Sequence, residues 1–118
     1  MSRNWLLYLD DIIESAEKIQ RFVGGRTYEN FRCDEATFDA VLFNLQIIGE
    51  SAKKLPESLR TDYPTFDWSA PARLRDLIAH HYFAIDAEII WEVATMHVPT
   101  LLAEARTLRK SVEGRQPY

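Results

Sequence analysis

The chain has 118 residues, 47% of them hydrophobic, which is enough for one domain with its own core but not for two. With only four glycines and five prolines, a turn-rich β-fold is disfavoured and helices are expected. At a formal net charge of −4, the overall field would not draw the protein onto a polyanion, so any nucleic-acid contact must be local. We therefore expect an all-α fold in a single domain over residues 1–118.

The chain contains no stretch typical of a signal peptide or a membrane helix. Asp10, Asp11 and Glu14 interrupt the apolar residues near the N-terminus. The longest stretches without a charged residue contain about a dozen residues, whereas a membrane helix needs about 20 apolar residues. The single cysteine, Cys33, excludes an intramolecular disulfide and fits a reducing compartment. A soluble, cytoplasmic protein without a membrane partner is expected.

Two long helices are predicted in the first half of the chain. Apolar residues recur at helical spacing over residues 4–23, and Gly24 and Gly25 end the pattern. Asp34 is expected to cap a second helix over residues 35–55. The main apolar stripe of this second helix is Phe38, Val41, Leu42, Leu45, Ile48, Ala52 and Leu55.

The second helix also has an apolar pair outside that stripe. Phe43 and Ile47 lie about 160° around the helix from Leu45, so one buried face cannot absorb both sets. Another subunit could cover the second face, which predicts a homodimer. Alternatively, a third helix of the same chain covers it, and the pattern alone does not choose between the two.

The second half of the chain predicts further helices with short connections. A helical turn follows Pro56, and Asp67 or Ser69 caps a third helix. Asp86 starts a fourth helix, which Pro99 kinks or restarts. Together, these predicted helices form an antiparallel bundle of four to five helices.

Polar residues of the segment "RDLIAHHYF" (75–83) are candidates for a functional site. Asp76 and His80 are spaced i and i+4, so the carboxylate could hold the imidazole and fix its tautomer for acid–base chemistry. Arg73 belongs to the same stripe. Spacing alone is more typical of an ordinary surface Asp–His pair.

Arg75 and Tyr82 share a different helix face. They are seven residues apart, about 20° out of register on an ideal helix. Arg75 and His80, however, are separated by about 140° of rotation and about 7.5 Å of rise, so a straight helix aims them apart. Either the helix loosens near His80, or a two-fold axis brings Arg75 of one chain towards His80 of another.

The other histidines are predicted to be structural, and no metal site is expected. His81 is in register with Leu74 and Ile78 and is interpreted as a histidine at the edge of the core. His97 has no acidic partner at helical spacing. The chain lacks Glu-x-x-His pairs, an HExxH motif and a glycine-rich phosphate loop, so we expect no metal and no other cofactor.

These residues resemble the Arg-x4-His-x-Tyr signature of HEPN-domain ribonuclease toxins of the HepT type. The surrounding "IGESAKKLPESLR" and "DWSAPARLRDLIAHHYFAIDAEIIWEV" are similar to that family along roughly residues 45–100. The resemblance implies a homodimeric helical bundle that cleaves RNA without a metal. In it, His80 moves a proton as the 2′-hydroxyl attacks the phosphate, Arg75 stabilises charge on the phosphoryl oxygens, and Asp76 orients His80.

The resemblance also implies a regulatory partner. In this family a minimal nucleotidyltransferase antitoxin transfers AMP to the motif tyrosine, here Tyr82, and silences the toxin of a type VII-like toxin–antitoxin system. In the dimer that the resemblance implies, the two Arg/His motifs line a shared cleft, and Glu50, Arg73 and His81 are possible residues of this cleft. An acidic ribonuclease must concentrate its cations at that cleft. The alternatives are a catalytically silent helical module that only binds the nucleotidyltransferase, and a structural dimerisation bundle.

Overall fold

The computed structural model describes residues 4–62 and 66–113, and every regular element in these ranges is helical, as predicted. The α-helices are α1 (Trp5–Val23), α2 (Tyr28–Cys33), α3 (Glu35–Lys53), α4 (Glu57–Asp62), α5 (Ser69–His81), α6 (Ala87–Glu92) and α7 (Val98–Glu113). A 3-10 turn, η1 (Tyr82–Ala84), follows α5, and a π-helical segment, η2 (Val93–His97), joins α6 to α7. Within the described ranges, no helix is both long and apolar enough to cross a membrane.

The first helix begins and ends where its sequence predicts. The side chain of Asn4 caps α1 by accepting a hydrogen bond of 2.9 Å from the Leu6 amide. Gly24 follows the last turn, and Gly25 has a φ of +75°, which a glycine adopts without strain. The predicted apolar face is fully buried at Leu6, Leu9, Ile12, Ala16 and Ile19.

The segment between the two predicted long helices, for which no helix was predicted, contains a short one, α2. Thr27 caps it by accepting a hydrogen bond from the Asn30 amide. Phe31 is fully buried, and its ring lies 5.7 Å from that of Phe38 and 5.2 Å from that of Trp91. One buried residue in a six-residue helix gives no apolar periodicity, which is why the sequence did not predict this helix.

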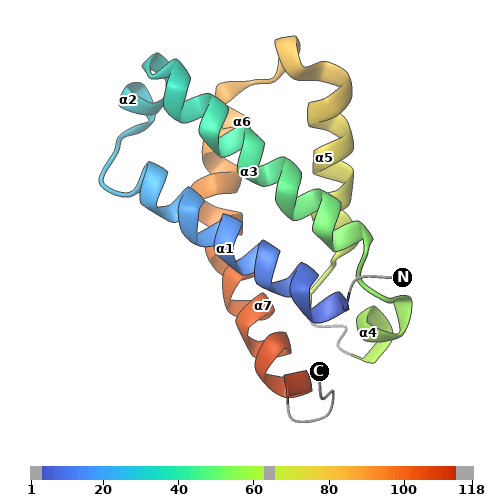
Figure 1. The fold of residues 1–118 in the computed structure, drawn as a ribbon. Coiled ribbons are helices and arrows are strands. Elements are labelled where there is room, and N and C mark those ends of the chain that lie inside the picture. Colours follow the sequence, from blue (N-terminus) through green and yellow to red (C-terminus); the bar gives the residue numbers. More distant parts are fainter. Residues whose placement is uncertain (1–3, 63–65, 114–118) are drawn as a thin grey trace.

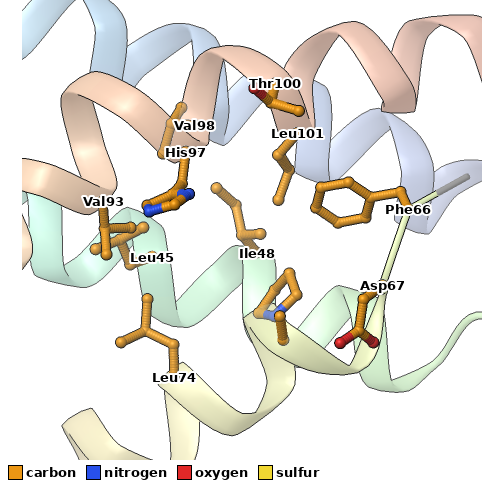
Figure 2. Close-up of a pocket in the computed structure, with 12 residues that line it drawn as sticks. Leu45, Ile48, Phe66, Asp67, Leu74, Val93, His97, Val98, Thr100 and Leu101 are labelled. Atoms are coloured by element: carbon orange, nitrogen blue, oxygen red, sulfur yellow. The ribbon is translucent and has the colours of Figure 1, made fainter.

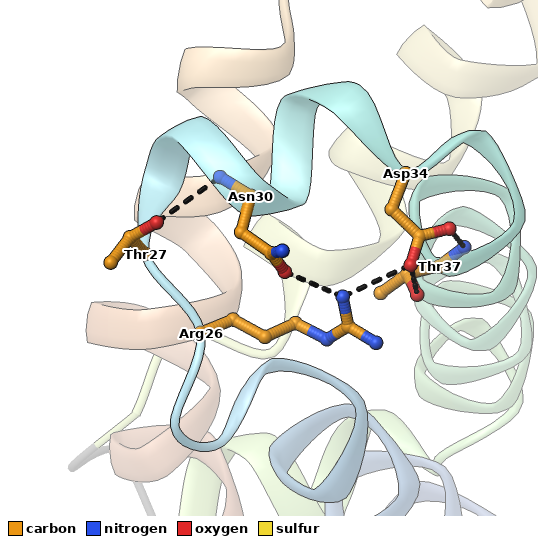
Figure 3. A network of polar contacts seen from close by, with 5 residues as sticks. All are labelled: Arg26, Thr27, Asn30, Asp34 and Thr37. Carbon is orange, nitrogen blue, oxygen red and sulfur yellow. Dashed lines mark hydrogen bonds and ion pairs between the residues drawn. The ribbon is translucent and has the colours of Figure 1, made fainter.

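A polar network fastens α2 to the start of α3 (Figure 3). The guanidinium of Arg26 donates to Asn30 at 2.7 Å and contacts the Asp34 carboxylate at 3.0 Å. Asp34 in turn accepts from the amide of Thr37, so the predicted cap of the second long helix is confirmed. These contacts lower the pKa of Asp34, chiefly through the hydrogen bonds from Thr37.

Helix α3 lies between α1 and α5 and packs against both (Figure 1). Its predicted main stripe is buried at Val41, Leu42, Leu45, Ile48, Ala52 and Leu55. On the second apolar face, Ile47 is half-buried, but Phe43 is 62% exposed. The same chain therefore covers only part of this face, and cover for Phe43 from a second subunit stays a prediction.

Pro99 restarts the last helix rather than continuing α6. The amide of Val98 donates to the carbonyl of Val93, five residues back, which is the π-helical pattern. Pro99 has no N–H to donate, so it is tolerated only in the first turn of a helix, where α7 begins.

Candidate active site on α5 and α3

Helix α5 is fastened at its N-terminal end by Asp67. The N-cap position is Trp68, which makes no side-chain capping bond, rather than the predicted Asp67 or Ser69. The Asp67 carboxylate, one residue earlier, nevertheless accepts a 3.0 Å hydrogen bond from the amide of Ser69, and the hydrogen bonds from Ser69 lower the pKa of Asp67. Arg73 contacts both Ser69 and Asp67. The structure thus ties Arg73, a possible cleft residue from the sequence, to the start of α5.

The helix is regular through both predicted catalytic residues. Helix α5 ends only at His81, where φ is −132° and ψ is 32°, after Arg75 and His80. The predicted loosening near His80 therefore does not occur between the two residues. On a regular helix their side chains leave the axis about 140° apart.

A glycine brings the backbone of α3 close to Arg75. A Cβ built on Gly49 would lie 2.2 Å from the Cβ of Arg75 and 2.6 Å from the carbonyl oxygen of Pro71, so only glycine fits here. The Arg75 guanidinium then reaches Glu50 of α3, with Nε 3.1 Å from the carboxylate. Its Nη1 lies 3.3 Å from the carboxylate of Asp76. The guanidinium is half-buried and oriented from two sides.

Asp76 contacts different groups from those predicted. Its carboxylate accepts a hydrogen bond of 2.7 Å from Lys53 of α3, and this bond lowers the pKa of Asp76, with a smaller contribution from Arg75. His80 is instead held by the backbone carbonyl of Asp76, 2.7 Å from its Nδ1. The expected carboxylate–imidazole contact is thus replaced, because Lys53 and Arg75 engage the carboxylate.

The contact at His80 defines its tautomer. A carbonyl oxygen can only accept, so Nδ1 carries the proton and donates it. In the neutral imidazole, Nε2 then has a free lone pair, which is the form a general base needs. The side chain is exposed, so a substrate can reach Nε2.

Tyr82 lies in η1, just beyond the end of α5, so the shared helix face predicted for it and Arg75 does not apply. Its hydroxyl donates a 2.9 Å hydrogen bond to the carboxylate of Asp39, near the start of α3. This bond raises the pKa of Tyr82. The ring is 40% exposed and meets the ring of Phe83 edge to face at 5.0 Å.

The partners of the motif residues form one stripe along α3. Asp39 accepts a hydrogen bond from Tyr82, Glu50 forms an ion pair with Arg75, and Lys53 forms an ion pair with Asp76. The exposed Phe43 lies on the same side of α3, because residues 39, 43, 50 and 53 are spaced by three, four and seven. We call Asp39, Phe43, Glu50 and Lys53 the α3 stripe. The sequence singled out Glu50 as a possible cleft residue and Phe43 as part of a face for a second subunit, whereas Asp39 and Lys53 were not identified although they share this spacing.

His81 lies beside a groove rather than in the stripe. The groove, about 320 Å³, is bounded by the end of α5, η1 and α6. It is lined by Leu74, Leu77, Ile78, His81, Ala84, Ile85, Asp86, Ile89 and Ile90. His81 is exposed at this groove and next to buried Ile78, in agreement with a position at the edge of the core.

His97 lines a separate cavity of about 370 Å³ between α3, α5 and the π segment (Figure 2). Its walls are mainly aliphatic and aromatic side chains, including Ile48, Phe66 and Leu101. The charged group among them is Asp67, an anion, so the lining does not suit an RNA phosphate. No group of three potential metal ligands is found within the described residues.

The all-helical fold and the Arg–His–Tyr segment on α5 and η1 define a ribonuclease of the HEPN class. The family model for HepT-like ribonucleases matches residues 12–108. The chain belongs to this family, which confirms the resemblance seen in the sequence.

Relatives along most of the chain carry ribonuclease names. "Putative RNase MJ0127" of Methanocaldococcus jannaschii is 40% identical over 107 residues, covering 91% of this chain and 88% of the relative. "Probable ribonuclease HepT" of Thermococcus cleftensis is 36% identical over 110 residues, covering 93% and 100%. "Putative RNase TTE0752" of Caldanaerobacter subterraneus is 32% identical, covering 86% and 90%. No solved structure matches the chain significantly.

Proposed function

We propose that this protein is a metal-independent endoribonuclease toxin, a single cytoplasmic domain over residues 1–118, in which His80 and Arg75 cleave RNA. The observation that carries the proposal is the 2.7 Å contact between His80 Nδ1 and the Asp76 carbonyl, because it leaves Nε2 as a free base on an exposed surface. Family membership supports RNA as the substrate.

The reaction needs one base and one stabiliser of negative charge. His80 Nε2 takes the proton of a ribose 2′-hydroxyl, and the oxygen attacks the adjacent phosphorus. The bond from phosphorus to the 5′-oxygen breaks, that oxygen receives a proton, and the products are a 2′,3′-cyclic phosphate and a free 5′-hydroxyl. Arg75 stabilises charge that develops on the phosphoryl oxygens.

Arg75 suits this role because its orientation is fixed before substrate arrives. Glu50 and Asp76 engage its Nε and Nη1, while a guanidinium offers five N–H donors in a planar fork. Both cations of the site are paired with carboxylates, since Lys53 contacts Asp76. RNA phosphate must compete with these acids, so we expect binding to weaken steeply with added salt.

We further propose that the active unit is a homodimer. Within one α5, Arg75 and His80 leave the helix in different directions, so one phosphodiester is most readily flanked by Arg75 of one chain and His80 of another. Phe43 supports this arrangement, because it is 62% exposed in the middle of the α3 stripe. A second chain that covered Phe43 would approach the site itself.

The proposed regulator is a minimal nucleotidyltransferase antitoxin that transfers AMP from ATP to Tyr82. The 40% exposure of Tyr82 leaves its ring accessible to such a partner. AMP on Tyr82 would add a bulky anion close to the site and repel RNA phosphate. Intact mass of the protein after incubation with the nucleotidyltransferase and ATP tests this step. A mass gain that Tyr82→Phe abolishes is expected, and an unchanged wild-type mass would contradict it.

Histidine substitution tests the catalytic proposal. We expect His80→Ala to lose at least about 100-fold of the cleavage rate and to stop inhibiting growth, since a positioned base contributes that much. His97→Ala is the matched control, because His97 lines the apolar cavity, and it should cleave like wild type. Wild-type cleavage is expected to persist in EDTA. Equal cleavage by His80→Ala would exclude the proposed base.

Phe43→Glu tests the dimer. We expect it to shift the protein towards monomer in light scattering after size exclusion and to reduce cleavage, because a buried unpaired carboxylate opposes association. Met96→Glu is the control, since Met96 is 64% exposed but lies on the π segment. An unchanged dimer in Phe43→Glu, or a wild-type monomer, would contradict the proposed interface.

A further inference from the structure

The turn that carries Tyr82 has little packing to hold it. None of the residues of η1 is buried, and Phe83 is 99% exposed. Such segments, with few buried apolar contacts, are generally the least stable parts of a fold. The hydrogen bond from Tyr82 to Asp39 joins η1 to α3 across 43 positions of sequence. It is therefore well placed to act as a tether.

The tether lies close to the proposed base. His80 belongs to the last turn of α5, and the regular backbone ends at the next residue, His81. Ends of helices fray unless their neighbours are held. Fixing Tyr82 against Asp39 thus restrains the chain two residues beyond His80. Loss of the tether would let the last turn open and release the contact between His80 Nδ1 and the Asp76 carbonyl.

We propose that Asp39 is a positioning residue of the ribonuclease: its hydrogen bond with Tyr82 holds the end of α5, and a group attached to the Tyr82 oxygen switches the enzyme off by breaking that bond. This inference rests on the proposed catalytic role of His80. It adds a residue from α3 that the sequence motif does not contain.

The chemistry of the modification explains why the bond would break. When the Tyr82 oxygen attacks the α-phosphorus of ATP, a phosphorus–oxygen bond forms, pyrophosphate leaves, and the phenolic proton is lost to a base. The modified oxygen has no hydrogen to donate, so it cannot bond to Asp39. The new phosphate also carries a negative charge beside Asp39 and near Glu35, whose charges already act on Tyr82. Repulsion would then push η1 away from α3.

Three variants isolate the tether without any modification. Tyr82→Phe removes the donor, Asp39→Ala removes the acceptor, and Asp39→Asn keeps an acceptor oxygen while removing the charge. We expect the first two to lower kcat about 3- to 10-fold, the size of one net hydrogen bond, with little change in KM. Asp39→Asn should restore most of the activity. Tyr28→Phe and Glu14→Ala are controls on α2 and α1 and should cleave like wild type.

The double variant Asp39→Ala with Tyr82→Phe separates a shared tether from two unrelated effects. If the two groups act through one bond, the double variant loses no more than either single variant. Amide hydrogen exchange in η1 and the last turn of α5 should speed up in both single variants, while the thermal midpoint is unchanged. A general structural defect would instead lower that midpoint.

The outcomes distinguish this inference from the proposed function. Cleavage by His80→Ala at the wild-type rate would overturn the proposed function. An inactive His80→Ala together with wild-type cleavage by Asp39→Ala would overturn the tether alone. Additive losses in the double variant would also overturn it. As a direct check of the bond, an absorbance titration should show the pKa of Tyr82 falling towards its ordinary value in Asp39→Ala.

Discussion

The two sides of α3 are built differently. Towards α1, the core consists mainly of apolar side chains, with Leu9, Ile12 and Val41 fully buried. Towards α5, the helices approach at Gly49, and the outer edge carries polar pairs such as Glu50 with Arg75. Helix α3 thus has one side that stabilises the fold and one that presents chemical groups.

Substitutions on the two sides should affect different properties, stability on the side towards α1 and activity on the side towards α5. Burial of aliphatic side chains is the main favourable term in folding, and each large one that is fully buried stabilises the fold by about 1.5–3 kcal/mol. Exposed ion pairs contribute little to stability, because water solvates both partners and salt screens them. We therefore infer that the polar pairs at the α5 edge serve to orient Arg75 and Asp76 rather than to stabilise the fold.

Arg75→Lys should have the largest effect on the α5 side. Lysine keeps the charge but cannot contact Glu50, Asp76 and a phosphate together, so we expect a loss of about 100-fold or more in kcat/KM with an unchanged thermal midpoint. Arg73→Lys is the matched control, because Arg73 is tied to Asp67 at the start of α5. Comparable losses in both variants would mean that the site has been wrongly assigned.

Ile12→Ala should have the opposite effect on the α1 side. Ile12 is fully buried, so its truncation is expected to lower the free energy of unfolding by about 2–5 kcal/mol in denaturant titrations. Cleavage per folded molecule at low temperature should be retained. Leu7→Ala, on the same helix but 39% exposed, should cost far less. A large loss of activity in folded Ile12→Ala would contradict the assignment of stability to one side of α3 and of activity to the other.

Sequence periodicity predicted the α1 side well, for a physical reason. Burial of one helix face imposes a repeat that local spacing reveals, as at Leu6, Leu9 and Ile12. The cap at Asp34 could be predicted for the same reason, because it involves Thr37, only three residues away. Helix α2 was missed because Phe31 is its one buried residue.

The α5 side was predicted only in part, because its contacts join distant positions. Spacing within one helix suggested that Asp76 would hold His80, but Lys53, 23 residues earlier, engages that carboxylate. The close approach at Gly49 and the partner of Tyr82 depend equally on how α3 and α5 pack. Family resemblance located the motif residues, whereas their α3 partners required the fold.

Gly49→Ala changes a residue that we expect to affect both the stability of the fold and the position of Arg75 in the site. The added Cβ would overlap the Cβ of Arg75, so α5 must shift, and we expect a loss of about 1–3 kcal/mol in stability together with reduced cleavage. Gly25→Ala is the control, since its φ of +75° makes alanine unfavourable by about 1–2 kcal/mol without touching the site. If both variants are destabilised and only Gly49→Ala loses activity in its folded fraction, the close approach positions Arg75. Equal activity in the two would separate Gly49 from the site.

Lys53→Gln should have the smallest effect, and pH reveals it. The bond from Lys53 lowers the pKa of Asp76 in the folded protein, so its contribution to stability is present above the unfolded value of 3.8 and is lost as pH falls through the folded value. In Lys53→Gln, the pKa of Asp76 measured by carboxyl NMR should rise towards 3.8, and the stability curves of the two proteins should converge in acid. Lys18→Gln, whose lysine contacts Glu14 on α1, should leave the pKa of Asp76 unchanged. An Asp76 pKa that stays at its wild-type value in Lys53→Gln would show that Lys53 does not lower it.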